Sequence, residues 1–171
     1  TLRKALAIGA DDAIRVNAEA EDGFFVANQL AEVVKNGSYD LVLAGRESID
    51  YNGGMVPGML ATILGFNFVN GCIGLEVEGN SATITREIDG GSEKMSADLP
   101  LVIAGQKGLV EEKDLRIPNM RGIMMARKKP LSVVEAIDIA NQTSSTSFEK
   151  PAAKGAVKLV DADNIDELIN F

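Results

Sequence analysis

The chain has no histidine and no tryptophan, and it has a single cysteine, Cys72, among its 171 residues. One cysteine excludes a disulfide within the chain and a cysteine-rich zinc site, and the lack of histidine argues against zinc of any kind. The chain also lacks the Ser/His or Cys/His pair of a nucleophilic enzyme. These absences point away from zinc chemistry and from catalysis through an activated side chain.

Positive charge is also in short supply, with 17 Lys and Arg against 25 Asp and Glu and a net charge of −8. Such a chain is a poor overall binder of nucleic acid, which is itself a polyanion. No apolar run approaches the roughly 20 residues that span a bilayer, and no basic segment followed by an apolar one marks a signal peptide. We therefore expect no nucleic-acid partner, no membrane insertion and a soluble intracellular protein.

The length and the 46% hydrophobic share suit about one globular domain. The chain begins with Thr1 and opens on a helical pattern, since Leu2, Ala5 and Leu6 share a face and Gly9 is a plausible helix end. A helix without its beginning leads us to expect that the N-terminal part of a longer protein is missing.

The first third of the chain alternates between helical and extended patterns. The spacing predicts strands over 12–16 and 39–44 and helices over 21–36 and from about 57 to 64. The apolar segment 39–44 is typical of a strand buried on both faces of a parallel sheet. This order indicates an α/β sheet with crossover helices.

The rest of the chain shows a different pattern, with alternating apolar and polar residues. Alternating runs over 68–77, 82–88 and 94–99, joined by Gly79-Asn80 and Gly90-Gly91, predict antiparallel hairpins, and a short apolar strand follows over 101–104. The expected continuation is an irregular stretch over 106–130, an ambiguous one over 131–139, a linker over 141–150 and a helix over 163–170. We predict an open, mainly parallel sheet flanked by helices, Rossmann-like, over residues 1–140, with antiparallel hairpin strands. Residues 141–171 form a linker and C-terminal arm.

The glycine-bearing segment 45–56 stands between the predicted strand 39–44 and the following helix. Unpaired N–H groups at a helix start, together with the helix dipole, favour an anion there. The segment therefore predicts a site for a phosphate-bearing ligand. The alternative is a solvated loop without a ligand.

A second group of motifs identifies a family. Residues 86–91 (Arg-Glu-Ile-Asp-Gly-Gly), followed by Glu93 and by Leu-Pro-Leu-Val-Ile-Ala over 99–104, strongly resemble the beta subunit of electron transfer flavoprotein. The similarity continues over 1–16, 41–50 and 123–130, in the same order. The direct role expected for Asp89-Gly90-Gly91 itself is a hairpin turn.

The resemblance implies that segment 45–56 binds AMP. The implied site residues are Gly45, Arg46, Glu47, Ser48, Ile49, Asp50, Tyr51, Asn52, Gly53, Gly54, Met55 and Val56. Backbone amides at Gly53-Gly54 and the helix start would cradle the phosphate, and Arg46 would offset its charge. Ser48 and Asn52 would donate hydrogen bonds to it, and Asp50 would orient the loop or meet a ribose hydroxyl.

The sequence departs from the family inside this segment. Many members carry a second Asp and then a Gln followed by Thr-Gly or Val-Gly, whereas this chain has Asn52, Gly53, Gly54 and Met55. Met55 cannot replace the hydrogen bonds of a glutamine, while Pro57 is tolerated in a first helical turn. The ligand therefore stays open between AMP and the second FAD that electron-bifurcating members hold in this region.

A further segment resembles the family's recognition loop, which docks dehydrogenases. It consists of Arg116, Ile117, Pro118, Asn119, Met120, Arg121, Gly122, Ile123 and Met124. Met120 stands where the family has a protruding Leu, and one exposed apolar side chain suits a small, quickly released hot spot. The alternative is that Met120 folds back onto its own core. The basic run 127–129 is expected to be solvated surface, to steer acidic partners or to help hold the loop.

The resemblance implies an electron-carrier subunit that is not an enzyme. It would form a heterodimer with an FAD-bearing alpha subunit, bind AMP structurally, accept electrons from dehydrogenases and pass them to a quinone reductase or another acceptor. The location would be the cytoplasm of a bacterium or the mitochondrial matrix of a eukaryote. Open alternatives are a bifurcating subunit with a second FAD, a stand-alone adenine-nucleotide-binding module, and an ATP-cleaving enzyme, although no Walker-type phosphate loop is present. The helix over 163–170 would pack on the alpha subunit or on its own domain.

Overall fold

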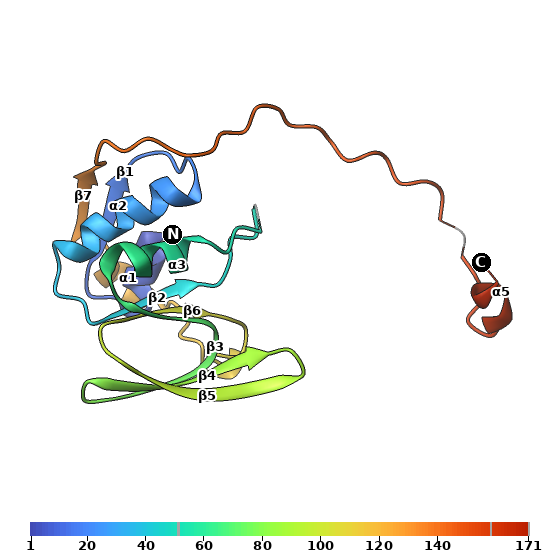
Figure 1. Ribbon diagram of the computed structural model, residues 1–171, viewed down its shortest axis with the longest axis horizontal. Coiled ribbons are helices and arrows are strands. Elements are labelled where there is room, and N and C mark those ends of the chain that lie inside the picture. Colours follow the sequence, from blue (N-terminus) through green and yellow to red (C-terminus); the bar gives the residue numbers. More distant parts are fainter. Residues whose placement is uncertain (51, 158, 171) are drawn as a thin grey trace.

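The computed structural model describes residues 1–50, 52–157 and 159–170. It has an α/β body and an extended C-terminal arm that ends in a short helix away from the body (Figure 1). The elements in chain order are α1 (Leu2–Ile8), β1 (Ala13–Asn17), α2 (Gly23–Lys35), β2 (Leu41–Gly45), α3 (Val56–Leu64), β3 (Asn67–Glu78), β4 (Ser81–Ile88), β5 (Gly91–Asp98), β6 (Leu101–Gly105), the 3-10 helix η1 (Glu112–Asp114), α4 (Met120–Ala126), β7 (Leu131–Glu135) and α5 (Ile165–Ile169). The predicted α/β class is confirmed.

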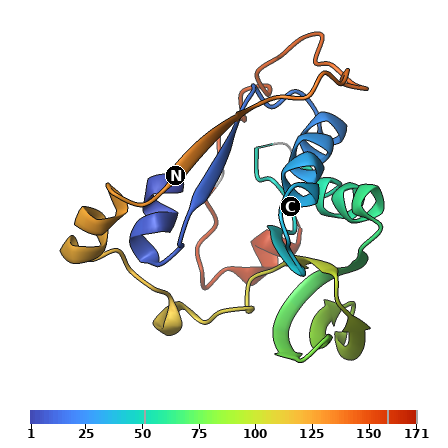
Figure 2. The ribbon, with the colours of Figure 1, turned by 90° about the vertical axis from the view of Figure 1, so that its left-hand side faces the viewer.

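The described strands form two sheets. β1 pairs in parallel with β7, and Figure 2 shows these two strands running side by side. The larger sheet has the order β2-β6-β3-β4-β5, in which β2, β6 and β3 are parallel and β3, β4 and β5 are antiparallel. The predicted combination of parallel strands with antiparallel hairpins is therefore confirmed. The parallel pairs are divided between the two sheets.

The two hairpins turn where glycine allows a left-handed backbone. Gly79 has a φ of 60° and Gly90 a φ of 79°, and the flanking pairs are Glu78 with Ser81 and Ile88 with Gly91. These short turns match the hairpin preference for glycine, which carries no Cβ to clash. The expected hairpin role of Asp89-Gly90-Gly91 is confirmed.

The most buried strand is β6. Its residues 101–104 have no exposed surface, because β2 and β3 flank its two edges while α3 and the side chains of the sheet cover its faces. The expectation that segment 39–44 is buried on both faces is wrong for the described residues. β2 is a sheet edge with one paired neighbour, and its Leu43 is 61% exposed.

The described part of the chain contains two apolar clusters, one within the larger sheet and one between helices. One lies within the larger sheet and contains Val69, Cys72, Ala82, Ile84, Leu101 and Ile103. The other joins α2 to α3 through Ala27, Ala31 and Leu60. Small alanines at this contact allow the two helices to approach closely. α3 ends as predicted at Gly65, whose left-handed backbone closes the last turn.

The stretch 106–130 contains more regular structure than predicted. It includes η1 and α4, so the expectation of an irregular segment is wrong over Glu112–Asp114 and Met120–Ala126. α4 begins with a side-chain cap, because the Asn119 side chain accepts a hydrogen bond from the Gly122 N–H at 2.7 Å. The ambiguous segment 131–139 contains β7, which is stabilised by a strand more than 100 residues earlier in the chain.

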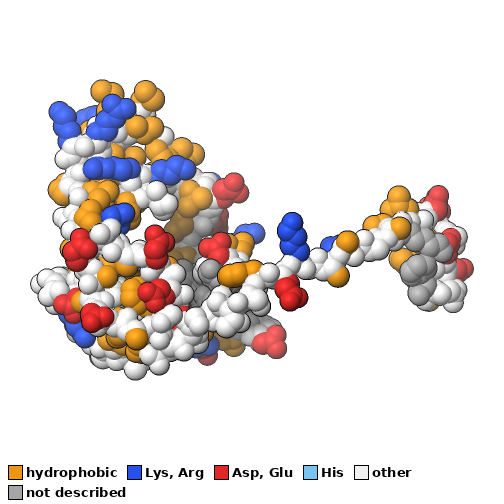
Figure 3. All heavy atoms as spheres, turned by 90° about the horizontal axis from the view of Figure 1, so that it is seen from above, with side chains coloured by type: hydrophobic (Ala, Val, Ile, Leu, Met, Phe, Trp, Pro, Cys, Tyr) orange, Lys and Arg blue, Asp and Glu red, His pale blue; other side chains and the backbone are white. Residues whose placement is uncertain are grey.

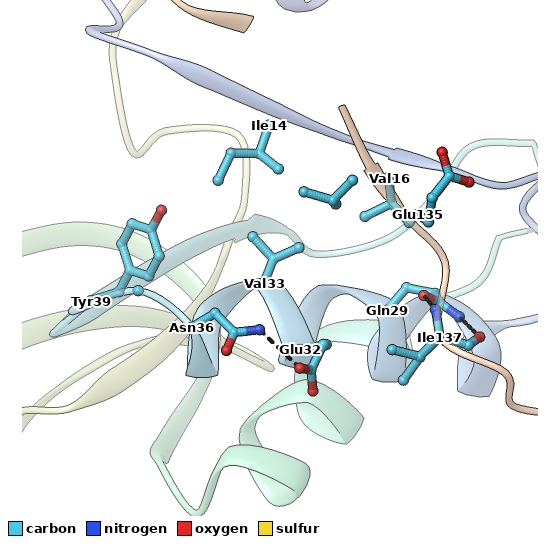
Figure 4. A pocket seen from close by; sticks show the side chains of 11 residues that line it. Ile14, Val16, Gln29, Glu32, Val33, Asn36, Tyr39, Glu135 and Ile137 are labelled. Atoms are coloured by element: carbon cyan, nitrogen blue, oxygen red, sulfur yellow. Dashed lines mark hydrogen bonds between the residues drawn. The ribbon is translucent and has the colours of Figure 1, made fainter. Parts of the chain in front are cut away.

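The segment that follows β7 is held by α2. The Gln29 side chain, 5% exposed, donates to the Ile137 carbonyl at 2.9 Å and accepts from its N–H at 2.9 Å. Figure 4 shows this two-way contact beside a cavity of about 350 Å³ between α2 and the β1–β7 sheet, with the Ile14, Val16 and Val33 side chains in its walls. None of the described residues of segment 45–56 lines this cavity.

Asp22 holds the next few residues. One carboxylate oxygen caps α2 by accepting from the Phe25 N–H at 2.7 Å, and the other accepts from the N–H groups of Gln142 at 2.6 Å and Thr143 at 2.8 Å. The hydrogen bond from Phe25, with those from Thr143 and Gln142, holds the Asp22 pKa below its ordinary value. The arm therefore leaves the body at the N-terminus of α2.

Residues 144–157 carry no helix or strand, and α5 is shorter than the predicted helix over 163–170. Its apolar side chains do not pack on the body. Ile165, Leu168 and Ile169 are 63%, 65% and 74% exposed.

Candidate functional site

Segment 45–56 connects β2 to α3, as its sequence predicts. Within it, the Ser48 N–H donates to the Gly53 carbonyl at 2.9 Å and the Gly53 N–H donates to the Ser48 carbonyl at 3.3 Å. Asn52 lies at the turn with a φ of 50°, a value that asparagine tolerates better than most residues. The segment is thus a small closed hairpin. Tyr51 lies outside the described residues.

The hairpin leads directly into the first turn of α3. Met55 occupies the cap position and makes no side-chain cap hydrogen bond, and Pro57 lies in the first turn as expected. Backbone N–H groups at this end therefore lack the side-chain partner that Asp22 supplies to α2. Two glycines accommodate the close packing. A Cβ at Gly54 would lie 3.4 Å from the Arg46 carbonyl oxygen, and one at Gly23 would lie 2.8 Å from Met55 Cγ.

Arg46 ties the segment to the neighbouring strands. Its N–H donates to the Gly105 carbonyl at 3.0 Å, and its Nη1 donates to the Gln106 side-chain oxygen at 2.5 Å. The Gln106 N–H in turn donates to the Cys72 carbonyl at 2.9 Å. The carboxyl ends of β2 and β6 and the middle of β3 therefore meet at this edge. The carboxyl ends of parallel strands are the usual place for ligands in open α/β sheets.

Gln106 is the site residue that the sequence reasoning missed. The signal was present, since Gln106 follows the predicted strand over 101–104 after Gly105, and parallel strands bring their carboxyl ends to one edge. Most of the other predicted residues that the structure describes face solvent, while Gly53 and Val56 are partly buried. Gly45, Glu47, Ser48 and Asp50 are exposed, and Ile49 is 90% exposed.

The second predicted segment, 116–124, divides into two parts. Residues 116–119 belong to no helix or strand, and residues from Met120 onward belong to α4. Met120 is 74% exposed, so it does not fold back onto the core. Ile117 protrudes even further, at 82% exposed. The segment thus presents two apolar side chains to solvent, on either side of Pro118 and Asn119.

α1 and α4 are joined by a reciprocal pair of cations. Arg3 on α1 donates to the carbonyls of Ala126 at 2.6 Å and Lys129 at 2.9 Å, at the C-terminal end of α4. The Lys129 ammonium donates to the carbonyls of Leu6 at 3.2 Å and Ala10 at 2.5 Å, at the C-terminal end of α1. Positive charge at a helix C-terminus satisfies unpaired carbonyls and complements the dipole. We call this arrangement the α1–α4 clamp. Within the basic run 127–129, Lys129 is therefore half-buried and bonded to α1.

Two further classes of site have no support among the described residues. No group of three or more His, Cys, Asp or Glu side chains is placed to hold a metal ion there, and none of the helices in the described part is long and apolar enough to span a membrane. Cys72 is fully buried, and burial raises the pKa of its thiol. A buried thiol of raised pKa is a weak nucleophile at neutral pH.

Comparison with known proteins agrees with this arrangement. Residues 1–139 match the electron transfer flavoprotein domain. The electron transfer flavoprotein subunit beta of Syntrophomonas wolfei is 38% identical over 166 residues, which cover 96% of this chain and 65% of that protein. The subunit beta of Bacillus subtilis is 36% identical over 142 residues, covering 81% of this chain and 54% of the relative. The subunit beta of Sus scrofa is 33% identical over 165 residues, covering 91% and 64%.

These matches have two consequences. The chain spans between about half and two thirds of the length of these curated relatives. The similarity also extends across the α/β body, and in two of the three relatives it covers more than nine tenths of this chain. The chain therefore belongs to the electron transfer flavoprotein family, among its beta subunits.

Proposed function

We propose that this chain is the electron-carrier beta subunit of a flavoprotein heterodimer. Together with an FAD-bearing alpha subunit it accepts electrons from dehydrogenases and passes them to a quinone reductase or another acceptor. The match to the electron transfer flavoprotein domain over residues 1–139 carries this proposal. In this proposal the chain contributes binding surfaces and acts as a carrier subunit, not as a catalyst of its own.

The arm supports the assignment of an alpha-subunit partner. It extends away from the body (Figure 1), and several of its apolar side chains are exposed. Phe148, Val157 and Leu159 are 83%, 80% and 89% exposed, and α5 adds three more. Apolar side chains on a segment without its own core are stabilised by burial against another surface. In this proposal that surface belongs to the alpha subunit.

Segment 45–56 is proposed to hold the nucleotide. The residues fit a phosphate in three respects: the α3 start has no side-chain cap, Arg46 brings a positive charge to the same edge, and Gly54 permits close backbone approach. AMP is the favoured occupant, because the family resemblance implies AMP at this segment. The family's second FAD is the alternative, since Met55 replaces a hydrogen-bonding residue.

Acid extraction of the intact heterodimer followed by chromatography tests the nucleotide proposal. We expect one adenine nucleotide per heterodimer besides one FAD, with AMP and a second FAD distinguished by retention time. Arg46→Gln is expected to reduce the retained nucleotide, because it removes the only cation of segment 45–56. Lys94→Gln on β5 is the matched control and should retain it in full. A heterodimer with a single FAD and no other adenine nucleotide would contradict the proposal.

A second experiment tests docking through segment 116–124. Ile117→Ala and Met120→Ala should each lower the second-order rate constant for reduction of the heterodimer by a dehydrogenase by about tenfold. This corresponds to a hot-spot loss of about 1.4 kcal/mol. The flavin content should be unchanged, because in this proposal the FAD is held by the alpha subunit. Stopped-flow flavin absorbance gives the rate constant.

Val77→Ala serves as the control for docking, since Val77 is also exposed, at 47%, but lies on β3. Its rate constant should equal that of the unmodified protein. Full-speed reduction of both variants by every dehydrogenase tried would show that segment 116–124 is not the docking surface.

A further inference from the structure

The clamped pair of helices encloses a hollow that the proposed function does not use. A cavity of about 570 Å³ lies between α1 and α4. Its apolar floor comes from Ala7, Pro118, Ile123 and Ala126, and its rim from Arg3, Lys4 and Arg127. No carboxylate is among these lining residues. The hollow is therefore an apolar depression edged by positive charge.

The surrounding lobe differs in charge from the rest of the molecule. Residues 1–16 and 116–135 hold eight of the 17 Lys and Arg residues but only three of the 25 Asp and Glu residues, so they carry +5 in a chain of net charge −8. α1 and α4 lie beside each other at one side of the molecule in Figure 2, and Figure 3 shows Lys, Arg and hydrophobic side chains gathered in one lobe while acidic side chains lie elsewhere on that face. This separation makes the lobe attractive to a negatively charged surface.

The two walls of the hollow are held at a fixed spacing. Arg3 and Lys129 form the α1–α4 clamp with four hydrogen bonds to carbonyl oxygens. Gly122 completes the contact, because a Cβ there would overlap the Ala7 carbonyl oxygen. By contrast, the Lys4 and Arg127 side chains make no hydrogen bond or ion pair with any described residue. The hollow is thus preformed, and two of its three rim cations are available to a partner.

We propose that the hollow between α1 and α4 is a second half of the docking surface, which receives an apolar side chain flanked by carboxylates on the electron-donating dehydrogenase. Ile117 and Met120 project beside it from the same segment that supplies Pro118 and Ile123. The partner thus meets a protrusion and a depression in one lobe, with Lys4 and Arg127 facing its carboxylates. This inference rests on the proposed docking function and adds α1 to it. It also states the chemistry of the partner.

Charge reversal at the rim tests the proposal in the intact heterodimer. The probe is the flavin-dependent dehydrogenase of the same organism that reduces the heterodimer fastest, measured by stopped flow. Lys4→Glu combined with Arg127→Glu should lower the association rate constant by about tenfold or more at low salt. The rate at saturating dehydrogenase should stay unchanged, because the charge reversal slows association and leaves the electron-transfer step as it is. Rising salt should reduce the difference between variant and unmodified protein.

Two control variants separate the effect of charge at the hollow from the effect of net charge and from the effect of a changed side-chain shape. Lys4→Met with Arg127→Met should give an intermediate loss. Lys94→Glu with Lys35→Glu, which makes the same change in net charge on β5 and α2, should give little or none. Circular dichroism of each variant should match the unmodified protein, since the clamp residues are untouched.

Two results would overturn the proposal. One is an unchanged association rate in the double reversal; if the oligomeric state changed at the same time, the hollow would be a contact between copies. The other is an equal loss in the β5 and α2 control. The docking experiment at Ile117 and Met120 separates the two hypotheses. If those variants are reduced slowly by the dehydrogenase while the double reversal is reduced at the normal rate, the proposal for the hollow is wrong and the proposed docking function stands.

Discussion

Ile84→Ala is expected to lower the free energy of unfolding of this chain by about 3 kcal/mol. The side chain is fully buried on β4, where it packs in the cluster that includes Leu101 and Ile103. Truncation of a buried isoleucine removes its transfer free energy and leaves a cavity, which together cost about 2–5 kcal/mol. Unfolding in guanidinium chloride, followed by circular dichroism, measures the loss as a shift of the midpoint at constant slope.

Ile88→Ala provides the matched control, with the same substitution in the same strand. Ile88 is 40% exposed and pairs with Gly91 beside the hairpin turn. Less apolar surface leaves water when it folds, so its truncation should cost about 1 kcal/mol or less. Equal losses in the two variants would mean that the two residues are buried alike, in conflict with the packing of β4.

Gly122→Ala is the second substitution with a large expected effect, and two physical terms oppose each other there. An alanine in place of glycine within a helix ordinarily gains about 1 kcal/mol. At this position, however, the new Cβ would overlap the Ala7 carbonyl oxygen on α1, which is a backbone atom and cannot rotate aside. Overpacking of this kind costs about 1–3 kcal/mol. We therefore expect a net destabilisation and a displacement of α4 from α1.

The displacement should be measurable beyond its effect on stability. It would pull the ends of α4 and α1 away from Arg3 and Lys129, which span them with hydrogen bonds of 2.5–3.2 Å. The melting temperature should fall, and trypsin should cleave the α4 region faster. Docking to dehydrogenases should slow in proportion.

Gly91→Ala is the control for the glycine substitution. An added Cβ there meets no atom within 4 Å, and its backbone is not left-handed. It should leave the melting temperature and the rate of proteolysis unchanged. A Gly122→Ala variant more stable than the unmodified protein would show that helix propensity outweighs the contact with Ala7.

Local chemistry allowed much of the fold to be predicted. The hairpin turns followed from Gly79 and Gly90, since a glycine between two alternating runs has few other roles. The end of α3 followed from Gly65 and its start from the polar segment with Pro57. In each case the determining interaction lies within a few residues, so the sequence pattern contains it.

Predictions failed where the determining contact is distant. β2 and β6 have similar apolar sequences, and only strand order placed β6 at the centre and β2 at the edge. α4 was missed because its helical pattern is short, and the contact with α1 that stabilises it joins residues more than 110 positions apart. Gln106 was missed for a similar reason, since its partner Arg46 lies in the segment after β2, 60 positions earlier in the chain.

The sequence by itself determined the α/β class, the family and the hairpins, because motifs and local backbone preferences are written in consecutive residues. It also predicted segments 45–56 and 116–124 as candidate sites. Only the tertiary structure decided which cations of the basic run are internal, how far Ile117 and Met120 protrude, and that α1 shares a hollow with α4. Exposure and long-range hydrogen bonds are properties of packed surfaces, and packing brings together residues whose separation along the chain carries no signal of their contact.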